Sequence, residues 1–218
     1  LPIEEARRRA ARIDWDAEPP ARPLRPGVHA FDVPVSELRR YIDWTPFFQA
    51  WELHGKYPQI LADSVVGAEA RRLLADAEAT LARIEREGLL HPRAVVGIFP
   101  AASIGDDVEV FADESRRGVR AIVHGLRQQF AKAPREGEER ENLCLSDFIA
   151  PAASGHPDWM GAFVVTAGRG AEELVRAYEA EHDDYRAILV KALADRLAEA
   201  LAERMHEVVR KELWGYAP

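Results

Sequence analysis

Apolar residues recur every three or four positions in two long segments of the chain. In residues 65–87 this spacing places them along one side of an α-helix, and Gly88 follows as a typical C-cap. The second segment, residues 171–214, contains neither proline nor glycine. Its apolar stripe consists of Leu189, Leu193, Leu197, Leu201 and Met205. The pattern predicts one long helix, or two helices that meet near residues 182–185.

Short apolar runs between these segments predict β-strands. Residues 94–99 (AVVGIF) lie between prolines, and residues 108–111 (VEVF) alternate and follow the turn-like IGDD, which predicts a hairpin. Further strands are expected at residues 121–123 and 161–166, and a charged loop at residues 135–141. Strands and helices do not alternate as βαβ units. We therefore expect an α+β fold: a single domain with a mostly antiparallel twisted sheet, flanking helices and a long C-terminal helical segment.

The first 34 residues differ in composition from the rest. Five prolines fall within residues 17–34, and proline removes a backbone donor and fixes φ. We expect residues 1–34 to form a proline-rich interdomain linker or arm, and residues 35–218 to form the domain. Ser36, with Glu37 behind it, is expected to cap a short helix at the entrance of that domain.

Composition limits the class of protein. The chain has 218 residues, of which 47% are hydrophobic and 30% charged, as in globular proteins. Its net charge of −8 argues against a nucleic acid as the main partner. The one cysteine, Cys144, cannot form a disulfide framework and is expected to be a small buried side chain. No apolar run reaches the roughly 20 residues that span a bilayer, and no secretory signal is present. We expect a cytoplasmic protein with no membrane partner.

Familiar catalytic motifs are absent from the chain: it has no Gly-rich dinucleotide loop, P-loop, zinc-protease motif or nucleophile elbow. We therefore expect no catalytic side chain and no metal ligand. Asp106 and Asp107 could ligate a cation, but a β-turn between two strands explains them more simply. Residues 182–184 (His-Asp-Asp) are adjacent on a helix, so a polar helix junction explains them better than a metal site.

Asp43 lies in a segment that is crowded with aromatic residues. A carboxylate in an apolar setting needs a donor or a cation, and beside aromatic rings it suits an ammonium or sulfonium ligand. The alternative is that Asp43 caps a helix that begins at Thr45-Pro46, with the aromatic rings in the core. The sequence chemistry leaves both open. The aromatic residues are Tyr41, Trp44, Phe47, Phe48, Trp51 and Tyr57.

Several long strings occur in the order found in one known family. They are IDWTPFFQAWELHGKYPQIL, AVVGIFPA followed by GDDVEVF, LRQQ, NLCLSDFIAP, GAFVVTAG and EAEHDDYRAILVKALADRLAEALAERMHEVVRKELWGYAP. On these strings, residues 30–218 resemble the activation domain of cobalamin-dependent methionine synthase.

The resemblance implies a function. The domain would bind S-adenosylmethionine and support the reductive methylation of cob(II)alamin to methylcobalamin during methionine biosynthesis. The cobalamin would be held by the cobalamin-binding domain of the same enzyme, and flavodoxin or a similar reductase would supply the electron. The chain would thus be part of a methyltransferase and would be inactive alone. The alternative is a docking module for the cobalamin domain or flavodoxin, with little S-adenosylmethionine binding of its own.

The resemblance also implies site residues. The Asp of the I-D-W-T-P-F-F motif, which binds S-adenosylmethionine in the family, is Asp43 here. The Glu of D-R-L-A-E-A is Glu199, and Arg196 lies one turn before it, although a helix-surface ion pair is the alternative for this arginine. The family continues past W-G-Y-A-P to an R-x-x-x-G-Y-P segment that this chain does not contain. We therefore expect the domain to be C-terminally incomplete and its ligand site to be weakened.

Overall fold

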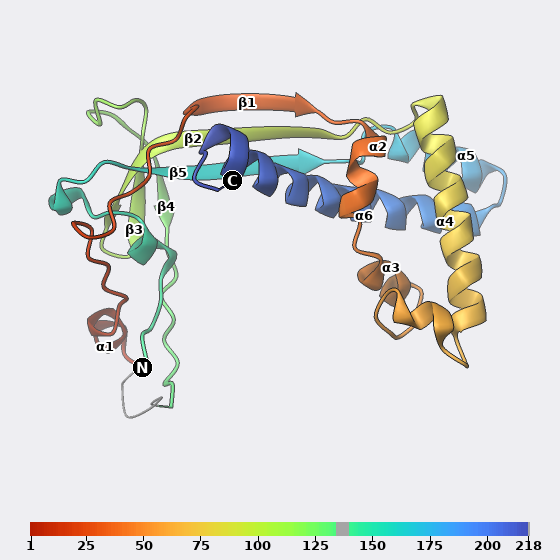
Figure 1. Cartoon of the computed structure of the whole chain (residues 1–218), viewed down its shortest axis with the longest axis horizontal. Helices are drawn as coiled ribbons and strands as arrows, with labels where there is room; N and C mark the ends of the chain where they lie inside the picture. Colours follow the sequence, from red (N-terminus) through yellow and green to blue (C-terminus); the bar gives the residue numbers. More distant parts are fainter. Residues whose placement is uncertain (134–139, 218) are drawn as a thin grey trace. The chain divides into compact units, whose positions relative to one another are not determined.

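The computed structural model describes residues 1–133 and 140–217 (Figure 1). The charged loop expected over residues 135–141 lies largely outside these described residues. The helices are α1 (Ile3–Arg8), α2 (Val35–Leu38), α3 (Trp44–Ala50), α4 (Gly67–Glu87), α5 (Ala171–Ala180) and α6 (Asp184–Val208). The strands are β1 (Gly27–Asp32), β2 (Arg93–Ile104), β3 (Asp107–Phe111), β4 (Val119–His124) and β5 (Asp158–Thr166). Short 3₁₀ turns cover Arg39–Tyr41, Gln59–Ala62, Leu145–Phe148 and Ala152–Ser154, and a π-helical segment covers Val209–Leu213.

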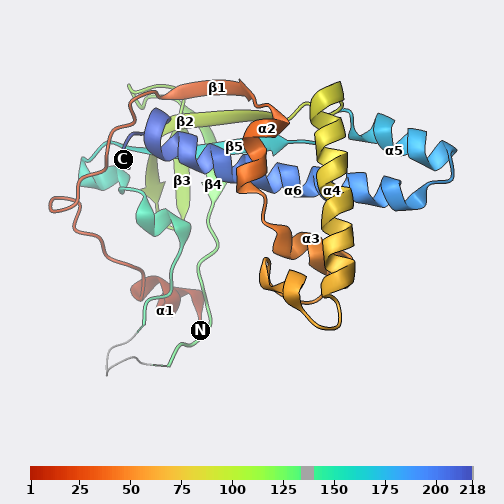
Figure 2. The same cartoon turned by 45° about the vertical axis from the view of Figure 1, so that its right-hand side comes forward.

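The backbone gathers into two compact units. The first consists of Leu1–Val28, Gly97–Ala162 and Arg210–Pro218, and the second consists of His29–Val96 and Phe163–Val209. Sheet-forming hairpins dominate the first unit and helices dominate the second (Figures 1 and 2). The predicted α+β class, with an antiparallel sheet and a long C-terminal helix, is confirmed.

The strands form a five-stranded sheet in the order β1-β2-β3-β4, in which β5 also pairs with β2. The predicted β2–β3 hairpin is confirmed, and its antiparallel register pairs Ile104 with Asp107 and Ala101 with Val110. Gly105 adopts a φ of 62° in the connecting turn, a conformation that favours glycine. Strand β2 is longer than predicted, because it continues beyond Phe99 to Ile104.

The proline-rich segment is packed onto the first unit. Trp214 donates its indole N–H to the Ala21 carbonyl at 2.7 Å, and the Arg25 N–H donates to the Leu213 carbonyl at 2.8 Å. Strand β1 follows and takes its place in the sheet. Regular structure therefore begins before residue 35, because residues 27–32 pair as a strand despite the surrounding prolines.

The second unit is built on α6. Its predicted apolar stripe is buried, with Leu193, Leu197 and Leu201 each 0% exposed. Helices α2, α3, α4 and α5 all pack against α6. Since about 0.8 kcal/mol accompanies each buried CH₂ group, this stripe is a main source of the stability of the unit.

The ends of the helices agree with the predicted positions in two cases and differ in one. Gly88 has a φ of 61° and ends α4 as predicted. The segment 171–214 divides into two helices, because His182 has a φ of 58° and Asp183 caps α6 through the Arg186 N–H at 3.0 Å. The Ser36 cap was wrong: α2 already begins at Val35 after Pro34, and no side chain caps it. The N-cap is Pro34, with φ −68° and ψ 145°, so Ser36 already lies inside the first turn and cannot cap it.

Candidate functional site

Asp43 is the N-cap of α3. One oxygen of its carboxylate, Oδ1, accepts a hydrogen bond from the Thr45 N–H at 2.9 Å, and its φ and ψ of −82° and 112° are typical of a capping residue. The predicted cap is therefore confirmed. Asp43 is also exposed, so its carboxylate can be reached by a ligand as well as by the helix.

Three of the aromatic residues after Asp43 belong to the core, whereas Trp51 is half-buried and Tyr57 is exposed. Phe47 and Phe48 are 1% and 0% exposed, and their rings meet edge to face with centroids 5.7 Å apart. Trp44 is buried as well and packs edge to face on Phe47. Asp43 is therefore not buried among these three rings, and its role toward a ligand stays a prediction. These buried rings pack the inner side of α3 against the core, and Asp43 lies at the surface.

Two contacts set this segment along one face of α6. On one side of Asp43, the Tyr41 hydroxyl donates a hydrogen bond to the Glu207 carboxylate. On the other side, the Trp51 ring packs on Tyr185 with centroids 5.3 Å apart. The residues on either side of Asp43 therefore contact α6 near its two ends, at Glu207 and Tyr185.

Arg196 and Glu199 lie on that same face of α6. Tyr185, Arg196 and Glu207 follow one another at spacings of eleven residues, which is close to three turns of an α-helix. Glu199 is almost one further turn from Arg196 and shares its side. The structure thus places the residues on either side of Asp43 against α6, the helix that carries Arg196 and Glu199.

The side chains of Asp43, Arg196 and Glu199 have different hydrogen-bond and ion-pair partners. Arg196 is 16% exposed at its side chain and pairs with Asp195 at 2.5 Å, so its ion pair is with a neighbour other than Glu199. Glu199 is exposed. No hydrogen bond or ion pair joins Asp43 to α6 within residues 1–133 and 140–217. The three side chains therefore offer two accessible carboxylates and one guanidinium.

The pKa values of two tyrosines that contact these helices, Tyr41 and Tyr185, are raised. Burial and the hydrogen bond to Glu207 raise the pKa of Tyr41. Burial also raises the pKa of Tyr185 to about 12, helped by the hydrogen bond that its hydroxyl donates to Asp76. Both hydroxyls therefore remain neutral donors at physiological pH. The sequence offered no signal for these two roles, because each partner is far away in the chain.

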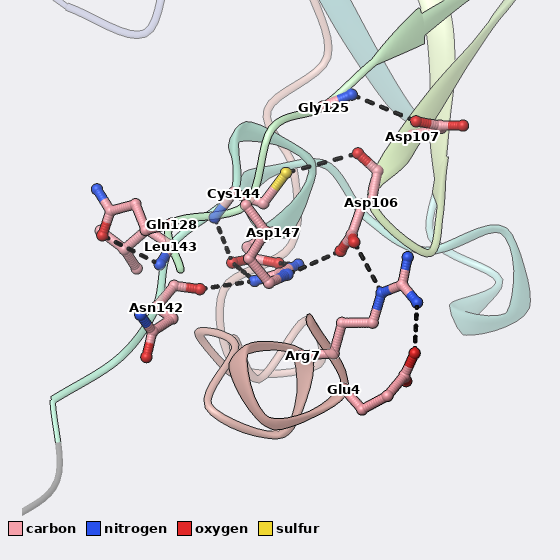
Figure 3. Close-up of polar contacts among 11 residues, drawn as sticks. Glu4, Arg7, Asp106, Asp107, Gly125, Gln128, Asn142, Leu143, Cys144 and Asp147 are labelled. Atoms are coloured by element: carbon pink, nitrogen blue, oxygen red, sulfur yellow. Dashed lines mark hydrogen bonds and ion pairs between the residues drawn. The ribbon is translucent and has the colours of Figure 1, made fainter. Parts of the chain in front are cut away.

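The other polar candidates are structural. Gly105 and Asp106 form the β2–β3 turn, and the Asp106 carboxylate pairs with Arg7 and Arg127 (Figure 3). Cys144 is buried as expected. Among the described residues there is no group of three or more His, Cys, Asp or Glu side chains that could hold a metal ion. The same residues include no helix that is long and apolar enough to cross a membrane.

Comparison with known families identifies this arrangement. The model of the family "Vitamin B12 dependent methionine synthase, activation domain" matches residues 34–218. The chain belongs to this family. The match begins where helix α2 begins, so it includes α3, α6 and all three predicted site residues of this activation domain.

A solved structure supports the same assignment. It is described as the crystal structure of the MetH reactivation domain bound to AdoHcy, and it matches the activation domain with a TM-score of 0.94 and 51% sequence identity. The match covers 100% of this chain and 66% of that chain. The activation domain described here thus spans about two thirds of the length of its solved relative.

Proposed function

We propose that this activation domain binds S-adenosylmethionine and supports the reductive methylation of cob(II)alamin to methylcobalamin within methionine synthase. The observation that carries the proposal is the relative that binds AdoHcy, because it is 51% identical over the entire chain. AdoHcy is what remains of S-adenosylmethionine after its methyl group has left. A site for one therefore fits the other except at the sulfonium.

The roles of the three residues follow from their chemistry. The exposed carboxylates of Asp43 and Glu199 suit the ammonium, the sulfonium and the ribose hydroxyls of the ligand, since they offer charged acceptors. Arg196 suits the carboxylate of the methionyl part of the ligand, and would exchange its pair with Asp195 for it. We expect Asp43 to be the strongest of these contacts.

The domain would act by positioning. The sulfonium makes the methyl group electrophilic, and reduction makes the cobalt nucleophilic, so the reaction needs alignment of two partners more than acid–base catalysis. The cobalamin would be held by the neighbouring cobalamin-binding domain of the same enzyme. The electron would come from flavodoxin or a similar reductase, and the domain alone would not complete a turnover.

The first 34 residues fit a connecting role. The family match starts at residue 34, directly after strand β1. We propose that residues 1–34 lead from a preceding cobalamin-binding module into the activation domain, and that residues 35–218 contain the ligand-binding part. The contacts of Ala21 and Arg25 mean that this connection is packed against the first unit along part of its length.

The test is calorimetric titration of the purified protein with S-adenosylmethionine, repeated for Asp43→Asn. Asparagine remains a good N-cap, so α3 should persist while the charged contact is lost. We expect affinity to fall about 10- to 100-fold, as for the loss of a hydrogen bond to a charged group. Glu199→Gln should give a smaller loss in the same direction.

Asp63→Asn is the matched control. The Asp63 carboxylate also accepts backbone hydrogen bonds, from the N–H groups of Val65 and Val66 at 2.8 and 3.0 Å in the turn before α4, and Asp63 is not one of the predicted site residues. This variant should bind S-adenosylmethionine normally. If Asp43→Asn binds as tightly as Asp63→Asn, the proposed role of Asp43 is wrong. A wild-type protein with no binding heat would argue for a docking role without the ligand.

A further inference from the structure

A buried ion-pair cluster lies in the first unit. The Arg127 side chain is 3% exposed and donates from Nε to Asp106 at 2.7 Å. Its two terminal nitrogens donate to the two carboxylate oxygens of Asp147 at 2.6 and 2.9 Å. Asp147 also accepts the N–H of Cys144 at 2.9 Å. One guanidinium between two carboxylates leaves this cluster with an excess negative charge.

Arg7 supplies the balancing charge from helix α1. Its Nε donates to the second oxygen of Asp106 at 2.8 Å (Figure 3). Asp106 is therefore bonded to both Arg7 and Arg127. The two arginines differ greatly in burial, because the Arg7 side chain is 51% exposed and that of Arg127 only 3%. Breaking a buried ion pair is costly when it leaves a charge unpaired. Loss of Arg7 would leave Asp106 still paired with Arg127.

The N-terminal residues also make hydrogen bonds to the rest of the first unit. The Asn142 N–H donates to the Arg9 carbonyl at 2.7 Å, and the Gln129 side-chain amide donates to the Leu1 carbonyl at 3.2 Å. Within residues 1–12, Ala6 is buried and its side chain is a single methyl group, while Leu1 and Ile3 are only half-buried. A segment with little buried apolar surface opens at low free-energy cost.

We propose that residues 1–12 form a strap that attaches reversibly to the rest of the first unit, with Arg7 as its ionic anchor on Asp106. When the strap leaves, the backbone hydrogen bond of Ala11 to the Asp147 carboxylate is lost, but Arg127 continues to pair with both Asp106 and Asp147. The site that it leaves is an arginine-binding site: an exposed carboxylate oxygen on a cluster with excess negative charge. Since the anchor is half exposed, salt screens it far more than the buried pairs.

Two backbone N–H groups report separately on the strap and on the buried ion-pair cluster. The Asn142 N–H is bonded to the strap through the Arg9 carbonyl, whereas the Cys144 N–H is bonded to the buried cluster through Asp147. Residue-resolved hydrogen exchange by NMR can follow both in the whole protein. We expect Arg7→Ala to speed exchange at Asn142 about threefold or more, as for the loss of a partly exposed ion pair, and to leave Cys144 unchanged.

Arg8→Ala is the control, because Arg8 is adjacent and exposed but makes none of the contacts with Asp106. A salt series on the wild-type protein repeats the test without a mutation, and exchange should rise at Asn142 alone. The proposal is overturned if Arg7→Ala matches Arg8→Ala, or if salt leaves Asn142 exchange unchanged. It is equally overturned if Asn142 and Cys144 lose protection together, since the strap would then be integral to the cluster.

Discussion

The hydroxyl of Tyr185 on α6 donates a 2.7 Å hydrogen bond to the carboxylate of Asp76 on α4. The ring of the same tyrosine packs on Trp51 directly after α3. One side chain of α6 thus contacts both α4 and the end of α3 within the second unit.

Replacing Tyr185 by phenylalanine should therefore lower stability and change its dependence on pH. We expect a loss of about 1 kcal/mol in the free energy of unfolding at neutral pH, since one partly exposed hydrogen bond disappears while the ring contact stays. Burial, together with the bond to Asp76, raises the pKa of Tyr185 to about 12, whereas the unfolded chain titrates near ~10. This contribution is present below the unfolded value and is lost as the pH rises through the folded value.

Denaturant unfolding of wild type and Tyr185→Phe across the alkaline range checks both parts. The difference between the two proteins should shrink as the pH rises from about 10 to about 12. Tyr216→Phe removes a hydroxyl from an exposed tyrosine and should change little. A difference that is constant with pH would contradict the titration argument.

Replacing Arg127 by methionine should destabilise the first unit strongly. The substitution keeps an unbranched side chain but leaves the carboxylates of Asp106 and Asp147 buried without their shared partner. We expect a loss of about 3–5 kcal/mol, measured by chemical denaturation. Arg117→Met, at an exposed position on the same unit, should stay within about 0.5 kcal/mol of wild type. Equal effects of the two variants would show that the cluster contributes nothing.

Replacing Gly125 by alanine should also be costly. A Cβ atom at this position would collide with the Asp106 carbonyl oxygen and with the Cys144 sulfur, which lie beside the cluster. Overpacking of this kind costs about 1–3 kcal/mol, and more where backbone is struck. Gly118→Ala meets nothing within 4 Å and serves as the control. Thermal melting of both variants decides the matter, and a Gly125→Ala protein as stable as Gly118→Ala would refute it.

Replacing Leu197 by alanine should destabilise the second unit through a cavity. Leu197 is 0% exposed in the middle of the α6 stripe, whereas Ile188 on the same helix is 52% exposed. We expect about 2–5 kcal/mol for Leu197→Ala and less than half of that for Ile188→Ala, by urea denaturation. Similar losses at the two positions would mean that burial along α6 is not what stabilises the unit.

Local patterns predicted the elements whose signals are local. The apolar stripe of α6, the glycine that ends α4 and the β2–β3 hairpin were all readable from neighbouring residues. Strand β1 was missed because proline dominates the composition around it, although the prolines flank the strand rather than interrupt it. The Ser36 cap failed because the proline before Val35 already starts the helix.

In the candidate site, what the sequence could predict differs more clearly from what only the fold could show. Asp43, Arg196 and Glu199 were chosen from a resemblance, and their shared role in one site stays a prediction. The contacts that place the Asp43 segment on α6 are ones that no local pattern encodes. Tyr41 meets Glu207 and Trp51 meets Tyr185 across more than a hundred positions of the chain. The same holds for Arg127, whose partners Asp106 and Asp147 follow from the fold and not from spacing.

The spacing along α6 has an evolutionary consequence. Tyr185, Arg196 and Glu207 share a face because whole turns of helix separate them, and α6 has no glycine or proline that could absorb a change in length. An insertion or deletion of one residue between positions 185 and 207 would rotate one end by about 100° relative to the other. Tyr41 and Trp51 would then face different sides of the helix. Homologues should consequently tolerate side-chain exchange on this stretch while keeping its length invariant.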